Sequence, residues 1–199
     1  MRHGETAWNK ERRLQGQGNV PLSPHGVEQV KALVPVVRPY APATVTASDL
    51  ERARQTAEVL GYGDCTLDER LRETDLGVWT GLTIEELTAM RSADYHAWRA
   101  GTFLPEGAES SEMLTERVRP AIEELVGAPG PVLVIAHGGV VRAALEILLE
   151  LDMEKLVPVS AGSLTVVDVP EGWPDHEGAI AKLHSYNLTG YSGMGPVPD

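Results

Sequence analysis

The sequence predicts an α/β fold with three layers, α/β/α, in which a central, mostly parallel sheet is covered by helices on both faces. Short apolar runs rich in β-branched residues alternate with longer amphipathic stretches, as they do where helices connect parallel strands. The clearest unit is PVLVIAHGGVVRAALEILL, an apolar run followed by a glycine turn and a helical pattern. Because a strand that is apolar at every position must be buried on both faces, residues 131–136 are predicted at the centre of the sheet.

The same patterns predict the other elements. Strands are expected at 43–48, 131–136, 164–169 and 179–186, and helices at about 24–38, 50–60, 83–99, 109–127 and 139–150. A helix-start signal, a capping box or a cap followed by proline, is present at Ser23–Pro24, Ser48–Glu51 and Thr83–Glu86. Pro35 is expected to kink or end the first helix, because proline removes a helical hydrogen bond.

Residues 82–130 contain helical patterns but no convincing strand. They are therefore expected to form a small helical cap that is inserted into the sheet domain. A chain of 199 residues is long enough for one such domain with a sizeable core. We accordingly predict a single domain over 1–199, with the cap insertion at about 82–130.

Composition and charge argue against several classes of function. Seventeen basic and 29 acidic residues leave a net charge of -12, which disfavours nucleic acid and anionic membrane as partners, so an anionic ligand would need a local group of cations. The longest apolar runs are too short to span a bilayer, and a cytoplasmic location is expected. The single cysteine, Cys65, excludes an internal disulfide and a cysteine-built zinc site. The histidines lack the spacing of a metal site, so neither a metal nor a cofactor is expected.

Polar residues follow the predicted strands, at the edge where ligands of an open parallel sheet bind. His137 and Gly138 follow the predicted central strand, and Arg52 lies in the first turn of the helix after the strand at 43–48. Each candidate also has a structural explanation. His137 could be a hydrogen-bonded histidine at a strand end, Arg52 could lie on a solvated helix face, and Glu73 could form a surface ion pair. Taken singly, these residues leave both interpretations open.

Four motifs taken together are more specific. They are RHGETAWN at 2–9, SDLERARQTA at 48–57, LRETDLGVWTG at 71–81 and AHGGVVR at 136–142. In this order and at these intervals they resemble the histidine phosphatase superfamily, also called phosphoglycerate mutase-like, and within it the branch of small phosphatases. The resemblance implies the same fold, with a small helical cap, and a metal-independent hydrolysis of small phosphorylated metabolites.

The resemblance also implies a role for each matching residue. The residues it places around a bound phosphoryl group are Arg2, His3, Asn9, Arg52, Glu73, His137 and Gly138. Of these, His3 would take up the phosphoryl group and Glu73 would be the proton donor. Arg2 and Arg52 would clamp the phosphate oxygens. The other three would add hydrogen-bond donors: Asn9 through its side-chain amide, His137 through a second imidazole and Gly138 through its backbone N–H.

The chemistry of these residue types fits that implication. A neutral imidazole has a lone pair near neutral pH, so it can attack phosphorus and divide hydrolysis into two displacements through a phosphohistidine. Charge in the loose transition state spreads over three oxygens, which arginine forks can stabilise without a metal. A carboxylic acid at Glu73 would protonate the leaving alkoxide.

The chain departs from the family pattern near its beginning. Relatives usually have an apolar strand directly ahead of the RHG motif, which would hold the catalytic loop in the middle of the sheet. Only Met1 precedes Arg2 here, so the sequence does not show which residues hold this loop in place. Asn19 also stands where many relatives have an acid, outside the implied catalytic set.

Two other functions stay open. A cofactor-dependent phosphoglycerate mutase would share the core but have a longer cap. Here Glu73 and His137 are only 64 positions apart, and the acidic cap suits a second phosphate poorly, so a phosphatase is favoured. A noncatalytic phospho-ligand-binding protein with the same fold would be expected to have lost a core residue, and the implied catalytic set is intact.

The motifs beside the cap resemble those of broad-specificity phosphatases and of phosphatases that act on sugar-linked phosphoglycerates. Candidate cap contacts for the rest of the substrate are Trp79, Tyr95, His96, Trp98 and Arg99. Packing of the cap onto the sheet is the alternative role of the two tryptophans. A homodimer through apolar strand edges also stays open, since no coiled-coil pattern indicates an oligomer.

Overall fold

The structure is a computed structural model, and it describes residues 1–174 and 179–190. Its helices are α1 (Ala7–Lys10), α2 (Pro24–Val37), α3 (Glu51–Leu60), α4 (Ile84–Arg99), α5 (Ser111–Val126) and α6 (Gly138–Leu149). Its strands are β1 (Thr44–Ala47), β2 (Thr66–Leu67), β3 (Val132–Ile135), β4 (Ser163–Asp168) and β5 (Lys182–Thr189). Short 3-10 turns at Glu69–Leu71 and Gly77–Trp79 flank the LRETDLG motif.

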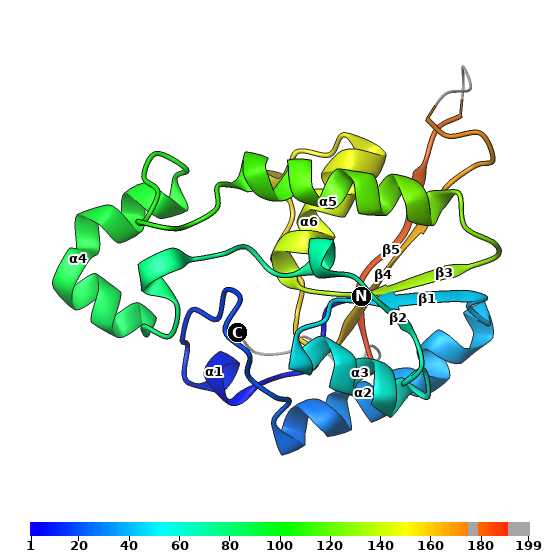
Figure 1. The fold of residues 1–199 in the computed structure, drawn as a ribbon, viewed down its shortest axis with the longest axis horizontal. Coiled ribbons are helices and arrows are strands. Elements are labelled where there is room, and N and C mark those ends of the chain that lie inside the picture. The colour runs from blue at the N-terminus through cyan, green and yellow to red at the C-terminus, as the bar shows by residue number, and fades with distance from the viewer. Residues whose placement is uncertain (175–178, 191–199) are drawn as a thin grey trace.

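The sheet is built around β3 (Figure 1). Three strands run in the order β2-β1-β3 with parallel pairings, and β4 and β5 form a separate antiparallel pair. Arg2 joins the two groups, because it forms a parallel bridge to Ala136 after β3 and an antiparallel bridge to Ser163 at the start of β4. The first residues of the chain therefore lie in the middle of the sheet, between β3 and β4.

The predicted fold class is confirmed, and β3 is central as expected. Each predicted strand and helix is present, with bounds that differ by a few residues at most. The sequence did not predict β2 or the antiparallel direction of β4 and β5. β2 has only two residues, both exposed, so it carries no alternation of apolar and polar side chains.

Helices cover both faces of the sheet (Figure 1). α2 and α3 lie on one face, where Leu33 of α2 shares an apolar core with Ile135 of β3. α5 and α6 lie on the other face, where Val118 and Val140 form a second core with Ala136. Since neighbouring residues of a strand point to opposite faces, Ile135 and Ala136 divide between the two cores.

Two of the three predicted helix starts are confirmed. The hydroxyl of Ser23 accepts a hydrogen bond from the N–H of Gly26, and Thr83 and Glu86 form the predicted capping box. Pro35, however, does not end α2, which continues past it. The buried stripe that α2 packs against the sheet outweighs the single hydrogen bond that proline removes.

The prediction that Ser48 caps α3 was wrong. The N-cap residue is Leu50, whose side chain makes no capping hydrogen bond. The hydroxyl of Ser48 instead forms a hydrogen bond with His137. The first N–H of α3 is bound by a residue from a distant loop, since Oδ1 of Asn19 accepts a hydrogen bond from the N–H of Glu51 at 2.8 Å.

The two helices within residues 82–130 have different surroundings. α4 projects from the body of the molecule (Figure 1) and has a core of its own, where Leu87 and Tyr95 pack with Trp79. α5 packs along α6 and contributes Leu114 to the second core of the main body. We therefore propose that the cap consists of α4 with its flanking loops.

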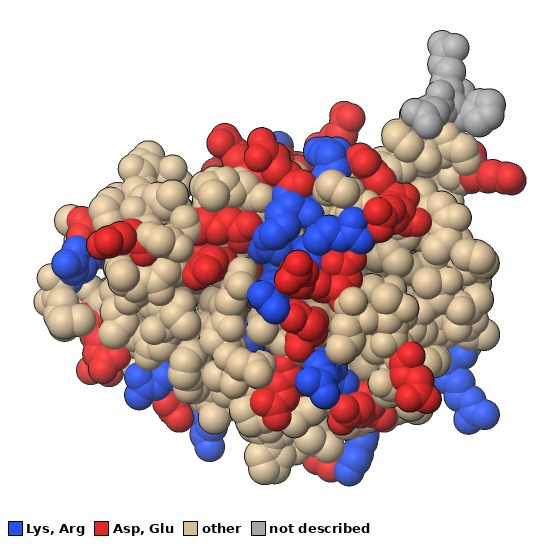
Figure 2. All heavy atoms as spheres, viewed as in Figure 1, with Lys and Arg blue, Asp and Glu red and all other residues tan. Residues whose placement is uncertain are grey.

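Acidic side chains are spread over the surface, in keeping with the net charge of -12 (Figure 2). On the face shown, several basic side chains gather near the centre, with acidic side chains around them (Figure 2). Arg70, for example, contacts both Asp68 and Glu124. In the described part of the chain, none of the helices combines the length and apolar character that crossing a bilayer requires.

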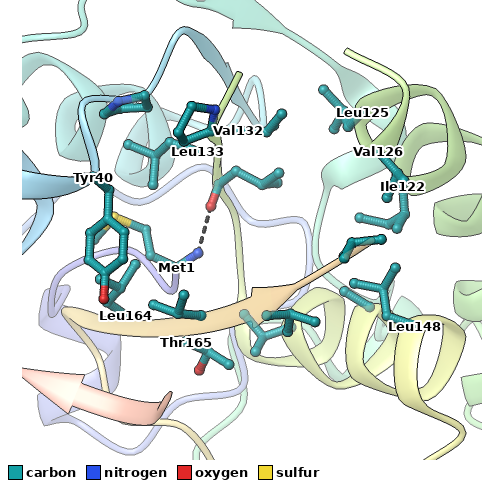
Figure 3. Close-up of a pocket in the computed structure, with 18 of the residues that line it drawn as sticks. Met1, Tyr40, Ile122, Leu125, Val126, Val132, Leu133, Leu148, Leu164 and Thr165 are labelled. Carbon is teal, nitrogen blue, oxygen red and sulfur yellow. Dashed lines mark hydrogen bonds between the residues drawn. The ribbon is translucent and has the colours of Figure 1, made fainter. Parts of the chain in front are cut away.

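An apolar cavity of about 530 Å³ lies beside Met1 (Figure 3). Aliphatic side chains of β3, β4, α5 and α6 line it, among them Val132, Leu164 and Ile122. The amino group of Met1 is buried there and donates a hydrogen bond to the carbonyl of Val134 at 2.6 Å. Desolvation lowers the pKa of this amino group from 8.0 to about 5.

This burial predicts a loss of stability in mild acid for protein that begins at Met1. Between pH 8 and pH 5 the unfolded chain binds a proton on its amino group that the folded chain does not bind. The free energy of unfolding should therefore fall as the pH falls through this range, by up to about 4 kcal/mol. Chemical denaturation at several pH values measures it.

An Nα-acetylated sample provides the control, because its amide keeps an N–H for Val134 but cannot be protonated. Between pH 6.5 and 8, above the usual pKa of histidine, the acetylated protein should show the flatter dependence. Equal slopes for the two samples in this interval would contradict the prediction.

Candidate active site

Segments that are distant in the sequence converge at the carboxyl ends of β1 and β3. The N–H of His3 donates to the carbonyl of Ala136 at 3.0 Å, and Arg2 bridges to both neighbouring strands. His137 follows Ala136 directly and is the N-cap residue of α6. Arg52 lies in the first turn of α3, after β1. Backbone bonds to β3 and β4 thus support the loop that carries Arg2 and His3.

His3 is buried, and its hydrogen bonds define which ring nitrogen carries the proton. Nδ1 lies 2.7 Å from the carbonyl oxygen of Gly4. Because a carbonyl only accepts, Nδ1 must be the protonated nitrogen. Nε2 then carries the lone pair, and it accepts a hydrogen bond from Nε of Arg52 at 3.2 Å. The ring nitrogen of His3 that carries the lone pair therefore faces Arg52.

His137 has the opposite tautomer. Its Nδ1 accepts from the same Nε–H of Arg52, at 3.2 Å, so the proton must lie on Nε2. Nε2 donates to the hydroxyl of Ser48 at 2.9 Å. The rings of His3 and His137 lie edge to face, with centroids 5.1 Å apart. Arg52 thus presents one N–H to both imidazoles.

Arg52 is fully buried, with 0% of its surface exposed. Nη1 donates to the carbonyl of Gly18 at 2.7 Å, and Nη2 donates to the carbonyl of Gly16 at 2.8 Å. Desolvation lowers the pKa of this guanidinium to about 10, partly offset by the negative charge of Glu73. The alternative of a solvated helix face is therefore wrong for Arg52.

Arg2 provides an unpaired donor. Its Nη1 donates to the carbonyl of Val159 at 2.5 Å. Its Nε is buried and, within the described residues, has no hydrogen-bond partner. Such orphan donors are rare in native proteins, because an unpaired buried N–H costs about 1–3 kcal/mol. Nε lies 3.8 Å from the position that a Cβ on Gly138 would take, beside the N-terminus of α6, which favours anions.

The electrostatic environment keeps both histidines neutral. Burial lowers the pKa of His3 well below 6.5, and the charges of Arg52 and Arg2 lower it further. The pKa of His137 is lowered by burial and then by Arg52 and His3. Because both rings stay uncharged, the lone pair of His3 remains available, and the positive charge of the pocket comes from the two arginines.

Glu73 lies against the glycine turn after β3. Its Oε1 accepts from the N–H of Gly139 at 3.1 Å and from the N–H of Thr74 at 3.0 Å. A Cβ on Gly139 would lie only 2.4 Å from that oxygen, so a larger residue at this position would displace the carboxylate of Glu73. Gly138 also lies beside the carboxylate. The position that a Cβ on Gly138 would take is 3.8 Å from Oε2 of Glu73. The alternative that Glu73 forms a surface ion pair is therefore wrong, because its carboxylate binds backbone N–H groups instead.

Asn9 has a structural role at the start of α1. Its Oδ1 accepts from both the backbone N–H and the hydroxyl of Thr6, which completes a capping box. The side-chain oxygen is thereby occupied, and Nδ2 is the group that could donate to a phosphate oxygen. The capping box also fixes α1 directly after the RHG loop.

The candidate cap contacts belong mainly to the interior of the cap. Trp79 is 2% exposed and stacks on Phe103, while Trp98 packs edge to face on Trp79. Tyr95 is buried in the same cluster. The two tryptophans therefore pack within the core of the cap itself and not onto the sheet, and Tyr95 packs with them. His96 and Arg99 are exposed at the end of α4.

Sequence reasoning missed Ser48 as a site residue because its spacing to Glu51 indicated a helix cap. It also missed Gln17, whose Nε2 donates to the carbonyl of Glu73 at 3.3 Å, since a single glutamine in a loop carries no pattern. Within residues 1–174 and 179–190, no group of three or more His, Cys, Asp or Glu side chains is arranged to hold a metal ion.

Replacing Ser48 with alanine should lower kcat/KM about tenfold. The substitution removes the acceptor that holds the proton of His137 on Nε2 and leaves a buried N–H unpaired. Steady-state release of phosphate, the product that the family resemblance implies, measures the effect. Ser48→Thr keeps the hydroxyl and should recover part of the rate. An unchanged kcat/KM for Ser48→Ala would show that this hydrogen bond does not matter for turnover.

Comparison with known proteins identifies the family of the chain. The model of the histidine phosphatase superfamily (branch 1) matches residues 1–178. Glucosyl-3-phosphoglycerate phosphatase from Mycolicibacterium vanbaalenii is 38% identical over 175 residues, 81% of this chain and 77% of that protein. Probable phosphoglycerate mutase GpmB from Salmonella arizonae is 37% identical over 150 residues, 69% of this chain and 67% of that protein.

A solved structure shows the same fold. Mycobacterial glucosyl-3-phosphoglycerate phosphatase in complex with VO3 superposes with a TM-score of 0.82 at 34% identity, covering 94% of this chain and 96% of that chain. The family match extends over all four motifs. The chain therefore belongs to the histidine phosphatase superfamily, branch 1.

Proposed function

We propose that this histidine phosphatase hydrolyses phosphomonoesters of small metabolites through a phosphohistidine at His3, without a metal. The observation that carries the proposal is the unpaired, buried Nε of Arg2 in the pocket where Nε2 of His3 presents its lone pair to Arg52. The pocket therefore combines a nucleophile with a hydrogen-bond donor that lacks an acceptor and could bind an anion.

In the first step, Nε2 of His3 forms a bond to phosphorus while the ester P–O bond breaks. Because Nε2 accepts from Arg52 in the resting protein, the substrate must take that N–H onto its own oxygens before the lone pair can attack. The spreading negative charge is stabilised by Arg2 and Arg52. Glu73, which must be protonated in the substrate complex, gives its proton to the leaving oxygen.

In the second step, water attacks the phosphohistidine. The carboxylate of Glu73 takes a proton from the water, the N–P bond breaks, and inorganic phosphate leaves. The electron pair returns to Nε2, so His3 is again neutral and Glu73 is again protonated. Throughout both steps, the hydrogen bond from Nδ1 to Gly4 holds the ring and stabilises its positive charge in the intermediate.

Trapping of the intermediate tests this proposal. Rapid quenching in alkali during turnover of a phosphomonoester should yield phosphate bound to the peptide that contains His3, and acid should release it. Turnover should persist after treatment with EDTA. Turnover with phosphate on another residue would overturn the mechanism, and binding without turnover would favour the noncatalytic alternative.

We further propose a sugar-linked phosphoglycerate as the substrate. The support is that relatives with 38% identity and a solved structure with TM-score 0.82 are named glucosyl-3-phosphoglycerate phosphatases. kcat/KM should be higher for glucosyl-3-phosphoglycerate than for 3-phosphoglycerate or an aryl phosphate. Equal values across such a panel would overturn the substrate assignment and leave the phosphatase mechanism in place.

A phosphoglycerate mutase is the second candidate, favoured by the likeness to probable GpmB. Incubation with 3-phosphoglycerate and its bisphosphate primer separates the two functions. A phosphatase releases inorganic phosphate, whereas fast interconversion of the phosphoglycerates with little free phosphate would establish the mutase.

A further inference from the structure

The loop that carries Glu73 is irregular between two 3-10 turns. It has few backbone hydrogen bonds of its own with which to keep a carboxyl group at a defined place. A general acid is effective only when its proton lies within hydrogen-bond reach of the leaving oxygen. Some other part of the fold must therefore hold this loop.

Arg117 of α5 contacts the loop along its length. Nη1 donates to the carbonyl of Arg70 at 2.7 Å and to the carbonyl of Arg72 at 3.1 Å. Nη2 donates to the carbonyl of Glu73 itself at 3.3 Å. One guanidinium thus binds three backbone carbonyls that lead up to and include the candidate acid.

The rest of the same guanidinium binds Glu109. Nε and Nη2 of Arg117 donate to its two carboxylate oxygens at 2.8 and 2.7 Å. Glu109 in turn holds the far side of the loop, because its Oε2 accepts from the N–H of Asp75 at 3.3 Å and its N–H donates to the carbonyl of Asp75 at 2.9 Å. Both sides of Glu73 are therefore tied to Arg117 or to its partner.

This arrangement differs from the other ion pairs on α5. The side chains of Arg117 and Glu109 are 24% and 11% exposed, whereas Arg119, which pairs with Glu123, is 48% exposed. The pairing of Arg117 with Glu109 neutralises both charges and leaves the guanidinium edges free to bind carbonyls. Only a planar fork of five donors can make these contacts, so lysine cannot replace it.

We propose that Arg117 is a positioning residue for Glu73, through which α5 fixes the general acid relative to the phosphate pocket. The inference rests on the proposed function, in which Glu73 is the proton donor. It predicts a selective defect, since an acid that is out of place matters most when the leaving group needs a proton.

The test compares Arg117→Lys with Arg119→Lys on two substrates. The lysine at 117 keeps a positive charge beside Glu109, so the protein should fold, but it cannot bind three carbonyls. With an alkyl phosphate, kcat should fall at least about tenfold, because a displacement of about 1 Å at a catalytic group is costly. With 2,4-dinitrophenyl phosphate, whose leaving group needs no proton, first-turnover release should stay within about threefold. Arg119→Lys should leave both rates unchanged.

Combination with Glu73→Gln separates this inference from the proposed function. If Glu73→Gln shows the selective loss and Arg117→Lys adds nothing to it, the positioning role is supported. If Arg117→Lys lowers both substrates equally, or its effect multiplies with that of Glu73→Gln, the inference is overturned while the function stands. If Glu73→Gln spares the alkyl phosphate, the assignment of the proton donor itself fails.

Discussion

Replacing His3 with alanine is expected to reduce phosphate release by about four orders of magnitude or more, the loss typical of removing a covalent nucleophile. In the proposed mechanism the attacking lone pair is the one on Nε2 of His3, and His137, whose lone pair on Nδ1 accepts from Arg52, is not the phosphoryl acceptor. Release of inorganic phosphate from an alkyl and an aryl phosphomonoester measures the loss.

The matched control is His25→Ala, which removes an exposed histidine from α2. It should leave turnover within about twofold, as surface substitutions usually do. Circular dichroism would establish that the His3→Ala protein is folded. A folded His3→Ala protein that retains a tenth of the activity would exclude His3 as the nucleophile.

Replacing Arg52 with methionine is expected to lower kcat/KM about a thousandfold and to destabilise the fold by about 3 kcal/mol or more. Methionine fills the space but leaves the carbonyl of Gly16 buried without a donor and removes one of the two donors to the carbonyl of Gly18, and the loss of a partner costs a buried polar group about 1–3 kcal/mol. The kinetic loss follows from removing a charge that stabilises the transition state. Thermal unfolding and phosphate release measure the two effects.

Arg54→Met is the control, since Arg54 is exposed on the same helix. If the methionine variant does not fold, Arg52→Lys replaces it. The lysine variant keeps the positive charge but cannot donate to two carbonyls and two imidazoles at once. Inhibition by inorganic phosphate reports on the anion site. Unchanged inhibition in Arg52→Lys would show that Arg52 supports the loop without binding phosphate.

The sequence predicted the fold and the set of candidate catalytic residues because both depend on local patterns. The all-apolar run 131–136 indicates burial on two faces, and four short motifs bring His3, Arg52, Glu73 and His137 into one family pattern. The motifs name the residue types. They contain no information on which nitrogen of His3 or His137 is protonated, since this depends on hydrogen-bond partners that the fold supplies.

The errors of sequence reasoning share one physical cause. Ser48 has the spacing of a helix cap, and only the position of His137, far along the chain, directs its hydroxyl elsewhere. Asn19 looked like a neutral departure from the family pattern, and it accepts from the first N–H of α3. Arg117 carries no motif, because its acceptors are backbone carbonyls, which every residue has.

The cavity beside Met1 has a practical consequence for preparing the protein. Because the backbone nitrogen of Met1 is buried between strands, any residues that precede it in a preparation, such as those of an N-terminal purification tag, would begin inside the sheet, one position from the RHG loop. A tag with an apolar, β-branched junction can continue the ladder along β3, whereas a glycine-serine junction cannot fill the space. Kinetic constants from differently tagged preparations should therefore be compared only when the residues at this junction are identical.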